Sequence, residues 1–234
     1  MKLALLGYGK MGRLIETIAL RQGLEIGPKL DINENPGGSG ITPASMEGVD
    51  VAIDFSQPEA VLPNIEAAAR AGVNLVVGTT GWADKRIKVE RIVRDSGIGL
   101  IHGANFSLGM NLFFEIVAHS ARVVGMLPQY DAFISEEHHR AKKDAPSGTA
   151  LNLLDLMRPH LNDPNLNIAS IRAGWIPGTH VIGFDSEADT ITLEHRARSR
   201  QGFAEGAVLA AQWIAGKKGF YDFRQVFREI VGLK

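Results

Sequence analysis

The stretch Leu3-Ala4-Leu5-Leu6-Gly7-Tyr8-Gly9-Lys10-Met11-Gly12 decides the fold. Its four apolar residues before Gly7 indicate a buried strand, and apolar residues then recur at helical spacing at Met11, Leu14 and Ile18. A G-x-G-x-x-G turn between a strand and an amphipathic helix is typical of a dinucleotide-binding βαβ unit, because glycine lets the backbone approach a pyrophosphate at the helix N-terminus. The alternative is a turn that only packs the helix against the sheet. The flanking strand and helix favour the nucleotide-binding interpretation.

Asp31 follows this turn by about twenty residues, the separation at which an acidic side chain accepts hydrogen bonds from the adenosine ribose of NAD. No arginine follows it, since Ile32 and Asn33 stand there. Lys10, inside the turn, is a candidate partner for the 2′-phosphate of NADP. The sequence therefore predicts NADH, NADPH or both as cofactor. The cofactor-binding residues expected in this region are Gly7, Tyr8, Gly9, Lys10, Met11, Gly12 and Asp31.

Short aliphatic runs alternate with longer helical stretches up to about Asn105, which is typical of βαβ units on a parallel sheet. The strands expected are Leu3–Leu6, Val49–Asp54, Leu75–Gly78 and Ile98–His102. Pro28 disturbs the strand expected before Asp31. Ser56 and Glu59 form a capping-box pattern at the start of a helix that ends at Gly72. These signals predict a Rossmann-type, doubly wound parallel sheet.

Beyond Asn105, neighbouring strands without a helix between them indicate a second, mixed or antiparallel sheet. The fold class expected is therefore α/β, with a second, α+β region after the parallel sheet. The segments expected are a helix at Leu112–Val124, a strand at Tyr130–Glu136, a helix at Thr149–Met157, a loop at Arg158–Asn167, strands at Ile168–Arg172, Val181–Phe184 and Thr190–Arg196, and helices at Phe203–Ala215 and Phe223–Val231.

Composition excludes several classes of function. The 234 residues are 45% hydrophobic and 22% charged with a net charge of −1, so no global positive field attracts nucleic acid or an anionic membrane. The chain has no cysteine, which excludes disulfides, thiolate metal sites and cysteine nucleophiles. The apolar run Met1–Leu6 is too short for a signal peptide, and no run is long enough to span a membrane. We expect a cytoplasmic protein.

Gly78-Thr79-Thr80-Gly81 and Asp54-Phe55-Ser56 stand at the ends of predicted strands. Ligands of doubly wound sheets bind at this edge, so the backbone and hydroxyls of the first segment are candidates to hold a carboxamide. The same residues also suit an ordinary turn from a strand to a helix.

The most distinctive segment is Glu136-Glu137-His138-His139-Arg140-Ala141-Lys142-Lys143-Asp144-Ala145-Pro146-Ser147-Gly148-Thr149. Tandem histidines followed by lysine can bind a carboxylate and deliver a proton near neutral pH. The Ser-Gly-Thr turn at the start of a helix is suited to binding an anion. The alternatives are a metal site and a solvated charged loop. A metal is disfavoured, because His138 and His139 are adjacent and no further Cys or His completes a familiar spacing.

The pattern H-H-x-x-K-x-D-A-P-S-G-T, present as His138 through Thr149, resembles the signature of the 4-hydroxy-tetrahydrodipicolinate reductase family. The resemblance covers almost the entire chain, and its other segments are Gly7–Gly12, Asp54–Ser56, Gly78–Gly81, Ala104–Asn111, Arg198–Arg200 and Phe203-Ala204. Many members have a longer stretch before Ile168–Arg172, and many have Arg-x-Gly-Asp and Gly-Glu-His where this chain has Arg172–Trp175 and Gly178–His180.

The resemblance implies a dinucleotide-binding domain of residues 1–108 and 200–234, with residues 109–199 forming a substrate domain that builds a homotetramer. It implies NADH- or NADPH-dependent reduction of a cyclic dicarboxylate in lysine and diaminopimelate biosynthesis, with no metal. Lys142 would donate the proton and His138 would be its catalytic companion. The substrate carboxylates would be bound by His139, Ser147, Gly148 and Thr149. The remaining cofactor contacts would come from Phe55, Gly78, Thr79, Thr80, Ala104, Asn105 and Phe106.

Two other functions are compatible with the glycine turn. One is a related two-domain dehydrogenase acting on homoserine, aspartate or a sugar, against which the pattern His138–Thr149 argues. The other is a nucleotide-sensing protein that has the fold without turnover.

Overall fold

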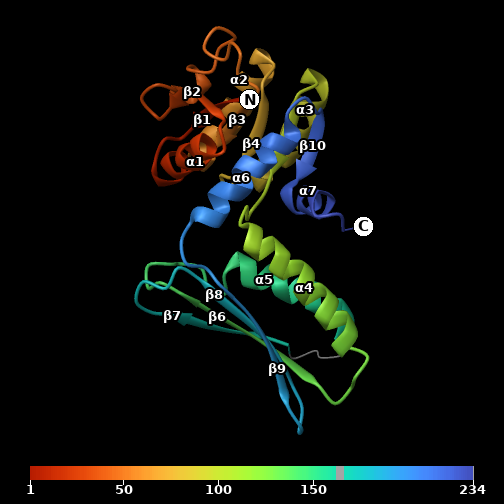
Figure 1. Cartoon of the computed structure of the whole chain (residues 1–234). Helices are drawn as coiled ribbons and strands as arrows, with labels where there is room; N and C mark the ends of the chain where they lie inside the picture. Colours follow the sequence, from red (N-terminus) through yellow and green to blue (C-terminus); the bar gives the residue numbers. More distant parts are fainter. Residues whose placement is uncertain (162–165, 234) are drawn as a thin grey trace. The chain divides into compact units, whose positions relative to one another are not determined.

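The computed structural model describes residues 1–161 and 166–233. The chain divides into two compact units, each with its own sheet (Figure 1). Unit 1 consists of Met1–Leu108 and Gln201–Lys234, and unit 2 is Gly109–Arg200. Among the described residues, no helix has both the length and the apolar character needed to cross a membrane.

The sheet of unit 1 is parallel throughout. Across the sheet the strands are β10 (Gly219–Asp222), β5 (Gly99–His102), β4 (Asn74–Val77), β3 (Val51–Asp54), β1 (Lys2–Leu6) and β2 (Glu25–Leu30). From β1 the chain first adds β2 on one side and then returns to add β3 on the other. The carboxyl ends of β1 and β3 therefore flank the point where strand order reverses, which is where doubly wound sheets bind ligands.

Helices cover both faces of this sheet because its strands are apolar on both sides. Leu3 and Leu5 of β1 pack with α1 (Lys10–Arg21), α6 (Gln201–Ile214) and α7 (Phe223–Ile230). Ala4 and Leu6, which alternate with them, pack with α2 (Pro58–Ala71) and α3 (Arg86–Ser96). The predicted doubly wound fold is confirmed.

Three details differ from the sequence prediction or refine it. The capping-box prediction is wrong, because α2 begins after Gln57 without a side-chain cap and the Ser56 hydroxyl bonds Asp54 instead. Pro28 lies in β2, which is an edge strand and tolerates a residue without an N–H. Strand β10 was not predicted, and its four residues pair with β5.

Unit 2 contains α4 (Leu108–Val124), β6 (Asp131–His138), α5 (Gly148–Met157), β7 (Ile168–Arg172), β8 (Thr179–Asp185) and β9 (Thr190–Arg196). Its sheet has the order β7-β6-β8-β9, with β6 parallel to β7 and antiparallel to β8. The expected mixed sheet is confirmed. Short 3-10 turns lie at Pro36–Gly38, Ala83–Lys85 and Arg158–His160. Part of the predicted loop Arg158–Asn167, residues 162–165, lies outside the described residues.

One face of the unit 2 sheet is covered and the other is open. Helices α4 and α5 lie on the covered face (Figure 1), where Val117 and Leu153 pack with Ile134 of β6. On the opposite face Phe133 and Ile171 are 43% and 49% exposed. The open face therefore carries apolar side chains that remain about half exposed.

Candidate functional site

The glycine turn is shaped by close backbone contacts. A Cβ at Gly7 would lie 2.6 Å from the Phe55 carbonyl oxygen, and one at Gly12 would lie 2.3 Å from the Gly7 carbonyl oxygen. Gly7 also has a φ of +84°, which favours glycine. A Cβ at Gly9, by contrast, would meet open space. The protein itself requires the outer two glycines, whereas the middle one leaves room for a ligand beside the N-terminus of α1.

A cavity of about 470 Å³ opens where the strand order reverses. It joins the glycine turn to the segment after β3 and the loop after β2. Its lining residues are Gly7, Gly9, Leu30, Asp31, Ile32, Asn35, Pro36, Gly37, Phe55, Ser56, Gln57, Glu59, Ala60, Pro63 and Asn64. The residues present fit a dinucleotide, since the N-terminus of α1 would suit its phosphates and Asp31 would suit its ribose hydroxyls.

The charged residues around this cavity are acidic. Asp31 and Glu59 are among its lining residues, and none of the described lining residues is lysine or arginine. The predicted cation, Lys10, is exposed at the first position of α1 and is not part of the lining. Tyr8 turns toward the protein, where its hydroxyl bonds Glu16, and Met11 packs on the core of unit 1.

A buried carboxylate connects three of the loops at this edge. Asp54, at the end of β3, accepts hydrogen bonds from the Ser56 hydroxyl at 2.6 Å, Asn64 Nδ2 at 2.8 Å and Thr79 Oγ1 at 3.1 Å. Asn64 in turn accepts from Asn35 Nδ2 at 2.8 Å. Burial raises the pKa of Asp54, and the hydrogen bonds oppose that rise. The network fixes the loops after β2, β3 and β4 to one another.

A smaller cavity of about 160 Å³ brings together the loops after β4 and β5. Of the predicted nicotinamide-binding residues, Thr79, Thr80 and Ala104 line it. Phe106 does not, because it is buried between Phe55 and Phe223, with ring centroids 6.1 and 4.4 Å away. The remaining lining residues are Gly81, Trp82, Ala83, Arg86, His102 and Gly103. Asn105 lies beside this loop, and its Oδ1 accepts from Ser107 N at 2.9 Å.

In unit 2 the polar centre is built around Glu136, which is fully buried at the covered face of β6. Its Oε1 accepts from Ser147 N at 3.0 Å, Ser170 Oγ at 2.8 Å and Arg172 Nη2 at 2.6 Å. Burial opposes ionisation, but the hydrogen bonds from Arg172, Ser147 and Ser170 outweigh it and lower the pKa of Glu136 to about 2. The carboxylate is therefore negative at neutral pH.

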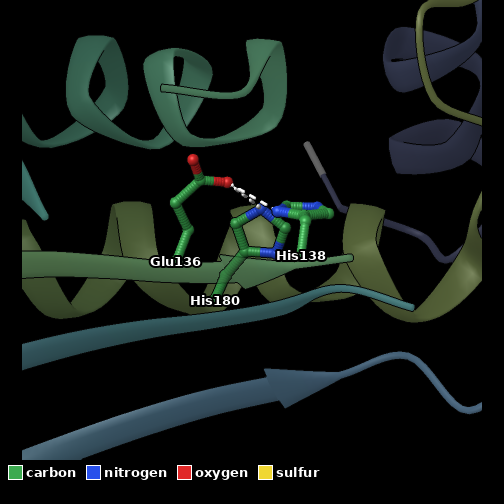
Figure 2. Close-up of side chains that lie close together, drawn as sticks. All are labelled: Glu136, His138 and His180. Carbon is green, nitrogen blue, oxygen red and sulfur yellow. Dashed lines mark ion pairs between the residues drawn. The ribbon is translucent and has the colours of Figure 1, made fainter. Parts of the chain in front are cut away.

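Two histidines face the other oxygen of Glu136 (Figure 2). Glu136 Oε2 lies 2.8 Å from His138 Nδ1 and 4.0 Å from His180 Nε2. Burial lowers the pKa of both imidazoles, and that of His180 falls to about 4, with His138 adding to the decrease. Both rings are neutral near pH 7. His180 Nε2 also lies 3.4 Å from Ser147 Oγ, the N-cap of α5.

These three groups are the one set of His, Asp and Glu side chains, among the described residues, whose ligand atoms lie close enough to hold a metal. Their geometry fits proton sharing better. Two ligands of a tetrahedral zinc ion are about 3.3 Å apart, given zinc–ligand distances of about 2.0–2.2 Å. The 2.8 Å between Glu136 Oε2 and His138 Nδ1 is a hydrogen-bond distance, and Arg172 already neutralises the carboxylate.

The loop from β6 to α5 carries the other predicted residues of this unit. Lys142 Nζ forms an ion pair with Asp144 Oδ1 at 2.8 Å, and the Lys142 side chain is 24% exposed. His139 is half-buried, and its carbonyl accepts from Lys142 N at 3.0 Å. The predicted helix start is confirmed, because Ser147 Oγ accepts from Ala150 N at 3.2 Å. Gly148 and Thr149 form the first turn of α5.

Sequence reasoning gave no role to several residues of these networks, among them Arg172, His180, Glu136 and Asp54. Arg172 and His180 are distant in sequence from His138 and reach it only through the pairing of β7 and β8 with β6. Glu136 offered a local signal, since residues two apart on a strand share a face and the strand ends at His138. The signal for Asp54 was its position at the end of an otherwise apolar strand.

Comparison with known proteins places both units in one family. The sequence-family model described as "Dihydrodipicolinate reductase, N-terminus" matches residues 1–106, and the one described as "Dihydrodipicolinate reductase, C-terminus" matches residues 109–227. The chain belongs to the dihydrodipicolinate reductase family. Membership of this family makes the chain an NAD(P)H-dependent oxidoreductase and confirms the resemblance carried by His138–Thr149.

Individual members of the dihydrodipicolinate reductase family match along nearly their full length. The 4-hydroxy-tetrahydrodipicolinate reductase of Christiangramia forsetii is 36% identical, with 98% of this chain and 99% of that protein covered. That of Archaeoglobus fulgidus is 38% identical, with 91% and 94% covered. A dipicolinate-bound dihydrodipicolinate reductase from Paenisporosarcina sp. TG-14 has the same fold, with a TM-score of 0.76, 22% identity, and 97% and 99% covered.

Proposed function

We propose that the chain reduces 4-hydroxy-tetrahydrodipicolinate to tetrahydrodipicolinate with NADH or NADPH, as a step of lysine and diaminopimelate biosynthesis in the cytoplasm. The observation that carries this proposal is the polar centre of unit 2. There His138, at the end of β6, and Ser147, at the start of α5, contact the buried Glu136 carboxylate, and Lys142 in the loop between β6 and α5 forms an ion pair with Asp144. Relatives over 30% identical along almost the whole chain are named for this reaction.

Each unit has a distinct role in this proposal. Residues 1–108 and 200–234 bind the dinucleotide, and residues 109–199 bind the substrate. A reduced nicotinamide held by unit 1 would supply the hydride for the unsaturated ring, and loss of the ring hydroxyl as water would take up one proton. Lys142 donates that proton with His138 as its companion. The substrate carboxylates are bound by His139, Ser147, Gly148 and Thr149, the last three at the N-terminus of α5, whose dipole favours an anion.

The same proposal assigns cofactor preference to Asp31. A carboxylate at this position accepts from both ribose hydroxyls of NADH and repels a 2′-phosphate unless a cation intervenes. Asp31 and Glu59 line the cavity, and Lys10 is the basic residue within the glycine turn Gly7–Gly12. We expect NADPH to be tolerated and NADH to be used at least as well.

The open face of the unit 2 sheet supports assembly into a homotetramer. Phe133 and Ile171 expose apolar surface there, and such a patch needs a partner. Sedimentation should give a tetramer that Phe133→Glu weakens. Ile116→Glu is a matched control, since Ile116 is also 43% exposed but lies on α4. A stable wild-type monomer at micromolar concentration would contradict the assembly.

A coupled assay tests the reaction. The unstable substrate is generated in the cuvette from pyruvate and aspartate semialdehyde by a synthase, and the loss of reduced nicotinamide absorbance is followed. We expect turnover that depends on both the chain and the synthase. Cofactor binding with no turnover would instead identify a nucleotide-sensing protein.

A further inference from the structure

The side chains around His138 determine which of its ring nitrogens carries the proton. Glu136 and His138 are two residues apart on β6, so both point to the covered face. Three donors hold Glu136 Oε1, namely Ser147 N, Ser170 Oγ and Arg172 Nη2. These bonds fix the plane of the carboxylate and leave Oε2 directed at His138 Nδ1, 2.8 Å away. Oε2 and Nδ1 are both buried, and the contact between them is an ion pair by distance but not a hydrogen bond by angle, so neither atom has a hydrogen-bond partner among the described residues.

The charge of Glu136 then determines which of the two atoms, Oε2 or Nδ1, accepts and which donates. An ionised carboxylate only accepts hydrogen bonds, and Arg172 Nη2 at 2.6 Å holds Glu136 in that form. A neutral imidazole has one N–H, which must lie on Nδ1 to meet Oε2. The opposite tautomer would place two lone pairs against each other at 2.8 Å in a buried site. His138 Nε2 is therefore the nitrogen with the free lone pair.

The surroundings of Nε2 keep it open. A Cβ on Gly178 would lie 3.0 Å from His138 Nε2, and Gly178 has a φ of +147°, which favours glycine. A side chain at this position would cover the nitrogen. His180 meets the His138 ring edge-on, with centroids 5.2 Å apart and planes at 75°, and so restrains its rotation.

We propose that Glu136 is a positioning residue that holds His138 as the Nδ1–H tautomer, so that Nε2 faces Gly178 as the working atom of the imidazole. Arg172 keeps Glu136 ionised for this purpose. The catalytic use of Nε2 rests on the proposed function, in which His138 accompanies Lys142 in proton transfer. The tautomer itself is a property of the free protein and can be measured without turnover.

Magic-angle-spinning NMR of protein labelled with 15N at histidine tests the tautomer. The chain has 7 histidines, so the His138 signals are assigned as those lost in His138→Gln. We expect wild-type His138 near pH 7 to show a protonated Nδ1 and an unprotonated Nε2. The opposite pattern in the wild type would overturn the proposal, whatever the behaviour of the variants.

Glu136→Gln tests the cause. A glutamine amide can donate to Nδ1, so the proton of His138 should move to Nε2. Glu137→Gln is the matched control, because Glu137 is the next residue of β6 and points to the open face. Its His138 signals should remain those of the wild type. An unchanged His138 tautomer in a folded Glu136→Gln protein would contradict the role of Glu136.

Turnover adds a readout that a purely structural role would not change. In Glu136→Gln we expect kcat to fall by about 100-fold, with the KM for NADH unchanged and the pH profile displaced to lower pH, because Glu136 no longer raises the pKa of His138. The groups that face His138 and share in this titration are Glu136, Arg172, His180, Lys142 and Asp144. An inactive wild type with the Nδ1–H tautomer would overturn the proposed function and leave the positioning intact.

Discussion

Asp54 and Glu136 are both fully buried carboxylates, one in each unit, and they differ in what surrounds them. Asp54 accepts only from neutral donors, those of Ser56, Asn64 and Thr79, and burial raises its pKa. Glu136 accepts from the Arg172 guanidinium, and its pKa falls to about 2. Neutral donors thus make a carboxylate a junction between loops, whereas a cation makes it a permanent charge that acts on its neighbour.

The comparison extends to the functions proposed for the two units. The network of Asp54 fixes the loops that border the cofactor cavity, so its loss should weaken binding. Glu136 lies beside His138, so its loss should slow turnover. Four predictions test this separation, beginning with the largest effect.

Lys142→Ala should separate turnover from binding most strongly. Removing the proposed proton donor is expected to lower kcat by about 10²–10⁴-fold, the usual contribution of general acid catalysis. The Kd for NADH, measured by titration of nicotinamide fluorescence, should stay close to that of the wild type. Asp144→Asn, which removes the ion-pair partner of Lys142, is the control and should have a smaller effect on kcat. Equal losses in kcat and cofactor affinity would contradict the role of Lys142.

Glu136→Gln and Asp54→Asn should both lower the free energy of unfolding, by unequal amounts. The first leaves the half-buried Arg172 without its counter-charge, which costs up to about 3 kcal/mol, the lower end of the range for a fully buried pair. The second places an amide among neutral donors and leaves one hydrogen bond unmade, which costs about 1–3 kcal/mol. Urea denaturation near neutral pH measures both. A larger loss of free energy of unfolding in Asp54→Asn than in Glu136→Gln would contradict this prediction.

Lowering the pH should change the stability lost in Glu136→Gln and the stability lost in Asp54→Asn differently. The lowered pKa of Glu136 gives stability that is fully present above its ordinary value of 4.5 and is lost as pH falls toward about 2. The advantage of the wild type over Glu136→Gln should therefore shrink by roughly 2 kcal/mol between about pH 5 and pH 3. The raised pKa of Asp54 acts in reverse, because the folded protein binds the proton more tightly. The advantage over Asp54→Asn should not shrink. Denaturation curves across this pH range decide the signs.

Cofactor preference should show the smallest effects. Asp31→Ala should weaken the binding of NADH by about tenfold, or about 1.4 kcal/mol, and leave the binding of NADPH unchanged. Lys10→Ala should weaken NADPH selectively and by less, since an exposed ion pair contributes about 0.2–1 kcal/mol. Fluorescence titration with both cofactors measures the four affinities. A wild-type preference for NADPH of about a hundredfold would contradict the assignment of Asp31.

The sequence predicted what depends on local pattern. The strand, glycine turn and helix from Leu3 to Ile18 form as expected, because period and turn chemistry agree over a short distance. The Ser147 helix start was predicted for the same reason. Strand β10 was not, since its edge position, pairing only with β5, requires just four residues that are neither strongly apolar nor alternating.

The partners of the two buried carboxylates were beyond local pattern. Arg172 and His180 approach Glu136 only because β7 and β8 flank β6, and a single sequence does not fix that register. Ser56 shows the converse failure. Its capping pattern predicted the wrong first residue, because α2 begins one residue later with Gln57 as its N-cap, and Ser56 donates its hydroxyl to Asp54.

The late return of the chain to unit 1 sets the order in which the two units can be completed during synthesis. Helix α6, which supplies Ala207 and Val208 to one face of the sheet, and strand β10, which forms its edge, are both translated after the whole of unit 2. Unit 2 can therefore fold on the ribosome while the sheet of unit 1 still lacks α6 and α7 on a face that α1 alone covers. A nascent chain stalled before Gln201 would present that face to chaperones.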